Sequence, residues 1–130
     1  ACSNATHGMT LSAVSIPYYT FIMPYGVKKF ARFAVNVWDI ARNGKTDEQL
    51  AKEGLCAMET WMKELGLAMN LTEIGVTSEM LDDIVNGTLI RELGVTEEML
   101  AGLVESTLIM EGGYKVLSKE DVRNVLIQAM

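Results

Sequence analysis

Apolar side chains recur every three or four residues along most of this chain, and no stretch alternates strictly between apolar and polar positions. Spacing of this kind is typical of amphipathic helices. It predicts helices over about 10–21, 27–43 and 46–65 and from Ser118 to about residue 128, with shorter helices between the last two. The pattern therefore predicts an all-α domain, a bundle-like arrangement of six or seven helices.

Local sequence motifs predict where several of these helices begin or end. Pro17 should kink or end the first helix, because proline has no N–H to donate to the preceding turn. Thr46 and Gln49 form a capping box, in which each side chain accepts a hydrogen bond from a free backbone N–H. Gly66 should end that helix, and Ser118 should begin the last one.

The periodicity also predicts which side chains are buried. Trp38 and Trp61 are interpreted as core residues rather than a binding box, and Cys56 as a buried, unreactive thiol. The apolar stripes predicted for the second and third helices consist of Phe30, Ala34, Val37 and Ala41, and of Leu50, Gly54, Ala57, Met58, Trp61 and Leu65.

Residues 71–90 and 90–109 form an internal repeat at an offset of nineteen residues. Each copy reads as a turn containing glycine, a threonine that caps a helix, acidic residues in the first turn, and a short amphipathic helix. Two copies are fewer than a solenoid needs. We interpret the repeat as a local duplication that packs on the rest of a single domain.

Composition and charge narrow the function classes. The chain has 130 residues, a net charge of -6 and 49% hydrophobic residues, which fits one globular domain. The acidic balance argues against nucleic acid and against an anionic membrane surface, because both need a basic footprint. The apolar run from 11 to 23 is too short to span a bilayer comfortably. Two cysteines form no disulfide framework, and a reducing cytoplasm fits them best.

Few residues could carry chemistry. His7 is the one histidine, and no cluster of cysteine and histidine accompanies it, whereas zinc sites need three or four protein ligands. The acidic residues Asp82, Asp83, Glu97 and Glu98 fit helix starts and solvated faces better than an acid–base pair. From its neighbours alone, His7 is more readily a surface or capping residue than a metal ligand.

Four segments, taken in order, resemble a known family. They are THGMTLSAVSIPYY at 6–19, KKFARFAVNVWDI at 28–40, METWMKELGLAMNLTEIGV at 58–76 and GGYKVLSKEDVRNVL at 112–126. Together they resemble the iron-dependent (group III) alcohol dehydrogenases, and the butanol dehydrogenase-like branch most of all. The order and spacing of the segments carry the resemblance more than any one motif, and they cover almost the whole chain.

The resemblance implies a two-domain enzyme that interconverts alcohols and aldehydes. An N-terminal α/β domain would bind NAD or NADP, and a C-terminal helical domain of the dehydroquinate synthase-like kind would complete the cleft. A divalent iron or zinc ion, held by one aspartate and three histidines, would polarise the substrate oxygen. His7 matches the last of those ligands. The other three, and the nucleotide domain, would precede Ala1.

Residues 1–130 are then expected to be the C-terminal domain of a larger cytoplasmic enzyme, and a homo-oligomer is expected. This piece alone should hold neither metal nor nicotinamide cofactor and should be inactive. One departure from the family pattern is the duplication at 71–109, which replaces a single copy. The alternative is a free-standing helical interaction module, in which the methionine-rich repeat binds a partner protein and His7 is incidental.

A domain separated from its neighbour exposes apolar surface that the neighbour had covered. The segment from Leu11 to Tyr25 should carry much of this surface. We therefore expect the isolated chain to self-associate, with a sedimentation coefficient that rises with concentration in analytical ultracentrifugation. A single monomeric species at high concentration would contradict the expectation.

Overall fold

The structure is a computed structural model that describes residues 7–86 and 114–130. Within these ranges it contains five α-helices, two short 3₁₀ helices and no strand. The all-α class predicted from the periodicity is confirmed for this part of the chain. The elements are α1 (His7–Ile22), η1 (Met23–Tyr25), α2 (Val27–Trp38), α3 (Asp47–Glu64), η2 (Thr72–Ile74), α4 (Ser78–Asn86) and α7 (Lys119–Gln128).

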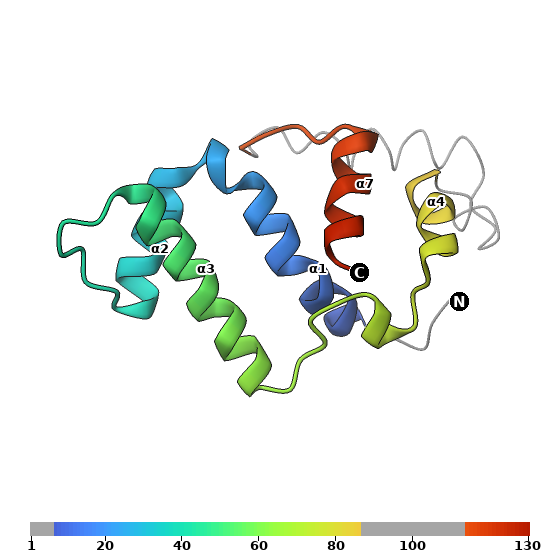
Figure 1. Cartoon of the computed structure of the whole chain (residues 1–130), viewed down its shortest axis with the longest axis horizontal. Coiled ribbons are helices and arrows are strands. Elements are labelled where there is room, and N and C mark those ends of the chain that lie inside the picture. The colour runs from blue at the N-terminus through green and yellow to red at the C-terminus, as the bar shows by residue number, and fades with distance from the viewer. Residues whose placement is uncertain (1–6, 87–113) are drawn as a thin grey trace.

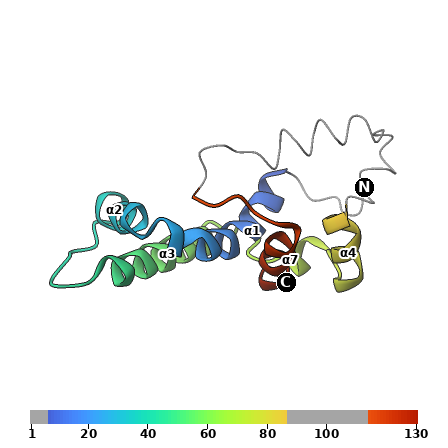
Figure 2. The same cartoon turned by 90° about the horizontal axis from the view of Figure 1, so that it is seen from above.

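Helix α1 lies between two groups of helices. Helices α2 and α3 run side by side at one end of the molecule, and α4 and α7 lie at the other (Figure 1, Figure 2). Contacts of α1 with both α3 and α7 join the two ends. One helix therefore belongs to both halves of the domain.

The core beside α7 is built from residues far apart in sequence. Buried apolar side chains of α1, of the segment around η2, of α4 and of the residue after α7 pack together there, namely Ala13, Leu71, Ile74, Val76, Leu81 and Ala129. The N–H of Leu71 donates to the carbonyl of Ala129 at 2.7 Å, and the Thr72 hydroxyl donates to the carbonyl of Met130 at 2.9 Å. These bonds fix the end of α7 against η2.

A second core lies between α2 and α3, where the contact depends on small residues. Ala31 and Ala34 of α2 are fully buried, as are Leu50 and Ala51 of α3. A Cβ atom built on Gly54 would lie only 2.7 Å from the Ala34 Cβ, closer than two carbon atoms can approach. The two backbones therefore meet at a distance that only glycine at this position allows.

The predicted helix caps are confirmed. Gln49 donates its backbone N–H to the Thr46 hydroxyl at 3.2 Å, and the Thr46 N–H donates to the Gln49 side chain at 2.9 Å. Ser118 caps α7 in a second capping box, whose other member is Asp121. Both predicted caps depend on residues three apart, which is why the sequence alone identifies them.

One predicted helix end is wrong. Helix α2 ends at Trp38 rather than near Asn43, because Asp39 has left-handed backbone angles (φ 53°, ψ 31°) and donates its N–H to the Ala34 carbonyl. Helix α1 continues through Pro17 to Ile22, close to its predicted end at about residue 21, and a kink at Pro17 stays a prediction. Asp39 takes the left-handed position that glycine more often occupies, and aspartate tolerates it better than most residues.

The buried faces of α2 and α3 are rotated from those predicted. Val37 and Leu65 were expected in the core but are 59% and 56% exposed, whereas Leu55 and Met62 are buried. The periodicity identifies an apolar stripe but not its centre. The positions of α1 and of the partner helix select the face that is buried, and those positions depend on the whole fold.

The structure describes the first copy of the sequence repeat as far as residue 86. A turn at Gly75 (φ 84°) precedes α4, which begins directly after Thr77. The second copy, at 90–109, and the glycine pair at 112–113 lie outside the described residues, so the duplication as a structural unit stays a prediction. Among the described helices, none has the length and apolar character needed to cross a membrane.

Replacement of Gly54 by alanine should destabilise the domain by up to about 2 kcal/mol. Alanine favours a helix over glycine by about 1 kcal/mol, but the forced separation of α2 and α3 costs about 1–3 kcal/mol. Chemical denaturation measures the difference. Gly8→Ala is the matched control, because a Cβ at this helical glycine meets nothing within 4 Å. Equal effects of the two substitutions would contradict the close contact.

Asp121 should make stability depend on pH in acid. Hydrogen bonds from Ser118, foremost from its backbone N–H, and from Lys115 hold the pKa of Asp121 below its ordinary value of 3.8. The charged form is therefore favoured in the folded state. Its stabilisation is present above about pH 4 and is lost as the pH falls through the lower, folded pKa.

We expect Asp121→Asn to lower the melting temperature at pH 7 and to leave a shallower decline between pH 5 and pH 2 than the parent chain shows. Glu120→Gln, in the same exposed first turn of α7, is the control and should preserve the parent's decline. A decline as steep in Asp121→Asn as in the parent would show that Asp121 does not carry the acid dependence.

Candidate functional site

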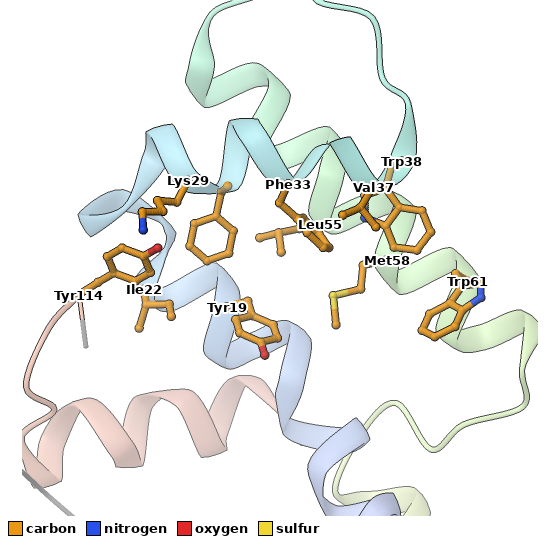
Figure 3. Close-up of a pocket in the computed structure, with 11 residues that line it drawn as sticks. Tyr19, Ile22, Lys29, Phe33, Val37, Trp38, Leu55, Met58, Trp61 and Tyr114 are labelled. Atoms are coloured by element: carbon orange, nitrogen blue, oxygen red, sulfur yellow. The ribbon is translucent and has the colours of Figure 1, made fainter. Parts of the chain in front are cut away.

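An apolar groove lined by aromatic rings lies between α1, α2 and α3. Its volume is about 630 Å³. We call it the aromatic groove and define it by its lining residues, which Figure 3 shows. They are Tyr19, Ile22, Lys29, Phe30, Phe33, Val37, Trp38, Leu55, Met58, Trp61 and Tyr114.

Helical spacing explains why these side chains meet. On α2, positions 30, 33 and 37 are three and four residues apart and share one face, as do positions 55 and 58 on α3. Tyr19 and Ile22 contribute the corresponding face of α1. Each helix directs one apolar edge, beside its buried core face, into the same space.

The aromatic rings contact one another around the groove. Phe33 stands edge-to-face on Trp38, with ring centroids 6.0 Å apart and planes at 87°, and Trp38 lies 6.0 Å from Trp61. At the opposite end, Phe30 lies 6.1 Å from Tyr114. Arrangements of this kind are favourable for aromatic pairs and hold the rings in fixed orientations.

Polar groups are few in the groove, and the Tyr19 hydroxyl lies between its two ends (Figure 3). Lys29 and Tyr114 stand at one end, and Trp38 and Trp61 at the other (Figure 3). The Trp38 indole nitrogen Nε1 is buried and has no hydrogen-bond partner within the described part of the chain. Lys29 forms no ion pair with any residue that the structure describes.

The sequence interpretation did not identify this groove. Trp61 was predicted to be a core residue but is 46% exposed, and Met58 is half-buried rather than buried. Cys56 was predicted to be buried and is exposed. The errors at Trp61 and Met58 follow from the rotated face of α3, whereas Cys56 lies outside the apolar stripe predicted for this helix. The clustering of both tryptophans with Phe33 was the available signal for a groove. The same helical spacing fits a closed core equally well.

Lys115 is held beside the groove by three groups. Its ammonium lies 4.9 Å from the Phe21 ring centroid and 5.2 Å from that of Tyr25, and it donates to an Asp121 carboxylate oxygen at 2.9 Å. The hydrogen bond to Asp121 is the main cause that raises the pKa of Lys115. The ring contacts with Phe21 and Tyr25 tie the segment that carries Tyr114 to the end of α1, and the bond to Asp121 ties it to α7.

The predicted metal ligand, His7, is the first residue of α1, and its side chain lies outside what the structure describes. Across residues 7–86 and 114–130, no three histidine, cysteine or carboxylate side chains come together as a metal site. The acidic side chains at 82, 83, 97 and 98 also lie outside the description. The structure therefore neither tests the histidine nor assembles the remaining ligands.

The first turns of α1 are nevertheless firmly anchored. Ser12 is buried, and its hydroxyl lies 2.7 Å from the carbonyl of Ala68, in the loop after α3, and 2.9 Å from that of Met9. Ala13 beside it is fully buried in the core next to α7. The start of α1 is thus positioned by residues more than fifty positions away in sequence.

Comparisons with known proteins relate the chain to two larger enzymes. A probable NADH-dependent butanol dehydrogenase 1 of Bacillus subtilis is 29% identical over 98 residues, which are 75% of this chain and 21% of that protein. The crystal structure of NADH-dependent butanol dehydrogenase A from Thermotoga maritima superposes with a TM-score of 0.71 at 26% identity. That match covers 97% of this chain and 29% of the other.

No protein-family model matches the chain. The chain spans less than a third of the length of both relatives, so the similarity concerns one part of each enzyme. The two findings agree in sequence and in fold, and they support an alcohol dehydrogenase-like helical domain.

Proposed function

We propose that residues 1–130 form the C-terminal helical domain of a metal-dependent, NAD(P)-linked alcohol dehydrogenase. The observation that carries the proposal is the superposition of 97% of this chain on part of a butanol dehydrogenase at a TM-score of 0.71. In the intact enzyme this domain would pack against an N-terminal nucleotide-binding domain and form one wall of the cleft for a small alcohol or aldehyde. NAD(P) would accept or supply the hydride.

His7 is proposed as one ligand of an iron or zinc ion in that enzyme. The described residues do not complete such a site, because no three histidine, cysteine or carboxylate side chains come together among them. The remaining ligands would come from the rest of the longer polypeptide. Anchoring of α1 through Ser12 supports the proposal, since a ligand at the start of a helix is held in place only if that helix is.

Surface features of α1 and η1 fit a domain that packs against a neighbour. Leu11 and Tyr25 are 51% and 53% exposed, and Tyr18 is 36% exposed. Apolar side chains at this density are typical of a covered surface rather than of one that faces water. We propose that the nucleotide-binding domain, a second subunit or both cover them in a homo-oligomeric, cytoplasmic enzyme.

The test uses the polypeptide encoded by the complete reading frame. We expect it to oxidise 1-butanol with a nicotinamide cofactor and to bind about one iron or zinc ion per subunit. His7→Ala should lower metal affinity by more than about tenfold and reduce activity with it, because one direct ligand is lost. Metal content by plasma emission spectrometry and cofactor reduction at 340 nm measure the two effects.

Cys56→Ser is the control, because substitution of this exposed residue on α3 should change neither the metal content nor the activity. An active, metal-loaded His7→Ala enzyme would exclude the proposed role of His7 as a metal ligand. It would not exclude the proposed dehydrogenase function. A reading frame that encodes no nucleotide-binding domain would contradict the proposed function as a whole and would favour the helical interaction module.

A further inference from the structure

We propose that the second copy of the sequence repeat, at 90–109, exchanges with the first copy on the surface that α1 and α7 form together. The exchange gives one chain two arrangements, which differ in the copy that packs into the core. We call this surface the α1–α7 surface and define it by Ala13, Val14, Leu126, Ala129 and Met130. The proposal goes beyond the dehydrogenase function and does not depend on it.

The first copy meets this surface through five apolar side chains. Four of them are buried and Met80 is half-buried, and all pack into the core next to α7. They are Leu71, Ile74, Val76, Met80 and Leu81. Between them, the chain turns at Gly75 with a left-handed φ of 84°, which glycine adopts without strain.

Each of these positions recurs nineteen residues later in the sequence. The corresponding residues are Ile90, Leu93, Val95, Met99 and Leu100, and Gly94 matches the glycine of the turn. Three of the five apolar residues are identical, and the other two exchange leucine with isoleucine, a change of shape at equal volume that cores tolerate. The second copy therefore carries every apolar side chain with which the first copy packs on the α1–α7 surface.

The connections of the chain allow either arrangement. With the first copy in place, residues 65–70 lead to it from α3, and residues 87–113 lead from it to Tyr114. With the second copy in place, residues 65–89 and 106–113 would be the two connections. One connection is short and the other long in both cases, so the entropic cost of closing them is nearly the same.

The short connection of the exchanged arrangement is long enough. An extended chain from residue 105 to Tyr114 spans up to about 30 Å. Helix α4 packs against α7, which is about 15 Å long, and Lys115 bonds to Asp121 in the first turn of α7. A second-copy helix in the place of α4 would therefore end within reach of Tyr114.

Polar contacts favour the first copy. The Thr72 hydroxyl donates to the Met130 carbonyl at 2.9 Å, and the Asn70 side chain forms two hydrogen bonds, at 2.7 and 2.9 Å, with the residue three positions later. The second copy has Arg91 and Leu89 at these positions and lacks the hydroxyl and the amide. Exposed hydrogen bonds change an equilibrium constant about twofold to fivefold each, so the first copy is the main occupant.

The occupant of the α1–α7 surface also affects the start of α1. Ser12, which anchors this helix, bonds to the carbonyl of Ala68 just ahead of the first copy. The exchange would bring Gly87 to the place of Ala68, with a carbonyl but no methyl group to pack against the core. The two arrangements therefore hold the start of α1 through different contacts.

The experiment compares one substitution at matched positions of the two copies. Leu81→Asp puts a charge into the core contact of the first copy, and Leu100→Asp puts it at the same position of the second. We expect Leu81→Asp to raise the equilibrium constant of unfolding less than about a hundredfold, because the second copy replaces the first and only the three hydrogen bonds are lost. Urea denaturation of the chain measures this constant.

Leu100→Asp alone should raise the constant less than about tenfold, since the first copy stays in place. The double variant should raise it more than about a thousandfold, because neither copy can then fill the core without a buried charge. Independent sites would instead give additive effects, so an excess in the double variant is the mark of the exchange.

NMR with methyl groups labelled by residue type observes the exchange directly. The N–H of Leu71 bonds to the Ala129 carbonyl in the first-copy arrangement, so the two residues are neighbours there. We expect the nuclear Overhauser contacts of Ala129 to move from Leu71 to Ile90 in the Leu81→Asp variant.

Arg91→Thr supplies the second copy with the hydroxyl that Thr72 gives to the first. Added to Leu81→Asp, it should lower the unfolding constant about twofold to fivefold, because the bond to Met130 is restored. Added to Leu100→Asp, it should have no such effect, since the second copy is then not in place.

An unfolding constant as high in Leu81→Asp as in the double variant would overturn the proposal. Contacts of Ala129 that do not move to Ile90 would overturn it as well. Contacts with Ile90 that arise only between two differently labelled chains would overturn an exchange within one chain.

Discussion

The half of the molecule that contains α2 and α3 depends on the close approach of these two helices at Gly54 and Ala34. A side chain at position 54 would collide with Ala34, so the helices meet over a strip of small residues. Leu50 is also fully buried in this contact, whereas large aromatic residues of both helices line the groove beside it. Phe33, Trp38 and Trp61 are placed there, and the aromatic groove is the space that they and α1 enclose. Close backbone contact and an open aromatic surface are thus two results of one packing arrangement.

The sequence predicts local features of this fold well and relative orientations poorly. Thr46 and Ser118 are recognisable as caps because the residues they bond lie three positions away. Val37 and Trp61 are wrongly predicted to be buried, because periodicity does not define the centre of an apolar face. Only the positions of the other helices select that centre. Asp39 ends α2 in a left-handed backbone conformation, and no glycine or proline at this position marks the helix end in the sequence. Each error concerns information that is distributed over the whole fold.

The candidate sites differ in the same way. His7 becomes a candidate ligand through resemblance to a family, because one histidine in isolation carries no metal-site pattern. The aromatic groove becomes visible only when three helices are placed, since its residues come from distant positions and alone resemble core residues.

The long-range bonds at the other end of the domain imply an order of folding. Helices α2 and α3 are neighbours in sequence, and a short connection joins them. By contrast, the bond from Ser12 closes a loop of 56 residues, and that from Thr72 closes one of 58. Closure of long loops is slow because its entropic cost precedes the gain from contacts. The α2–α3 hairpin should therefore form early, and the half that fixes the start of α1 should form last.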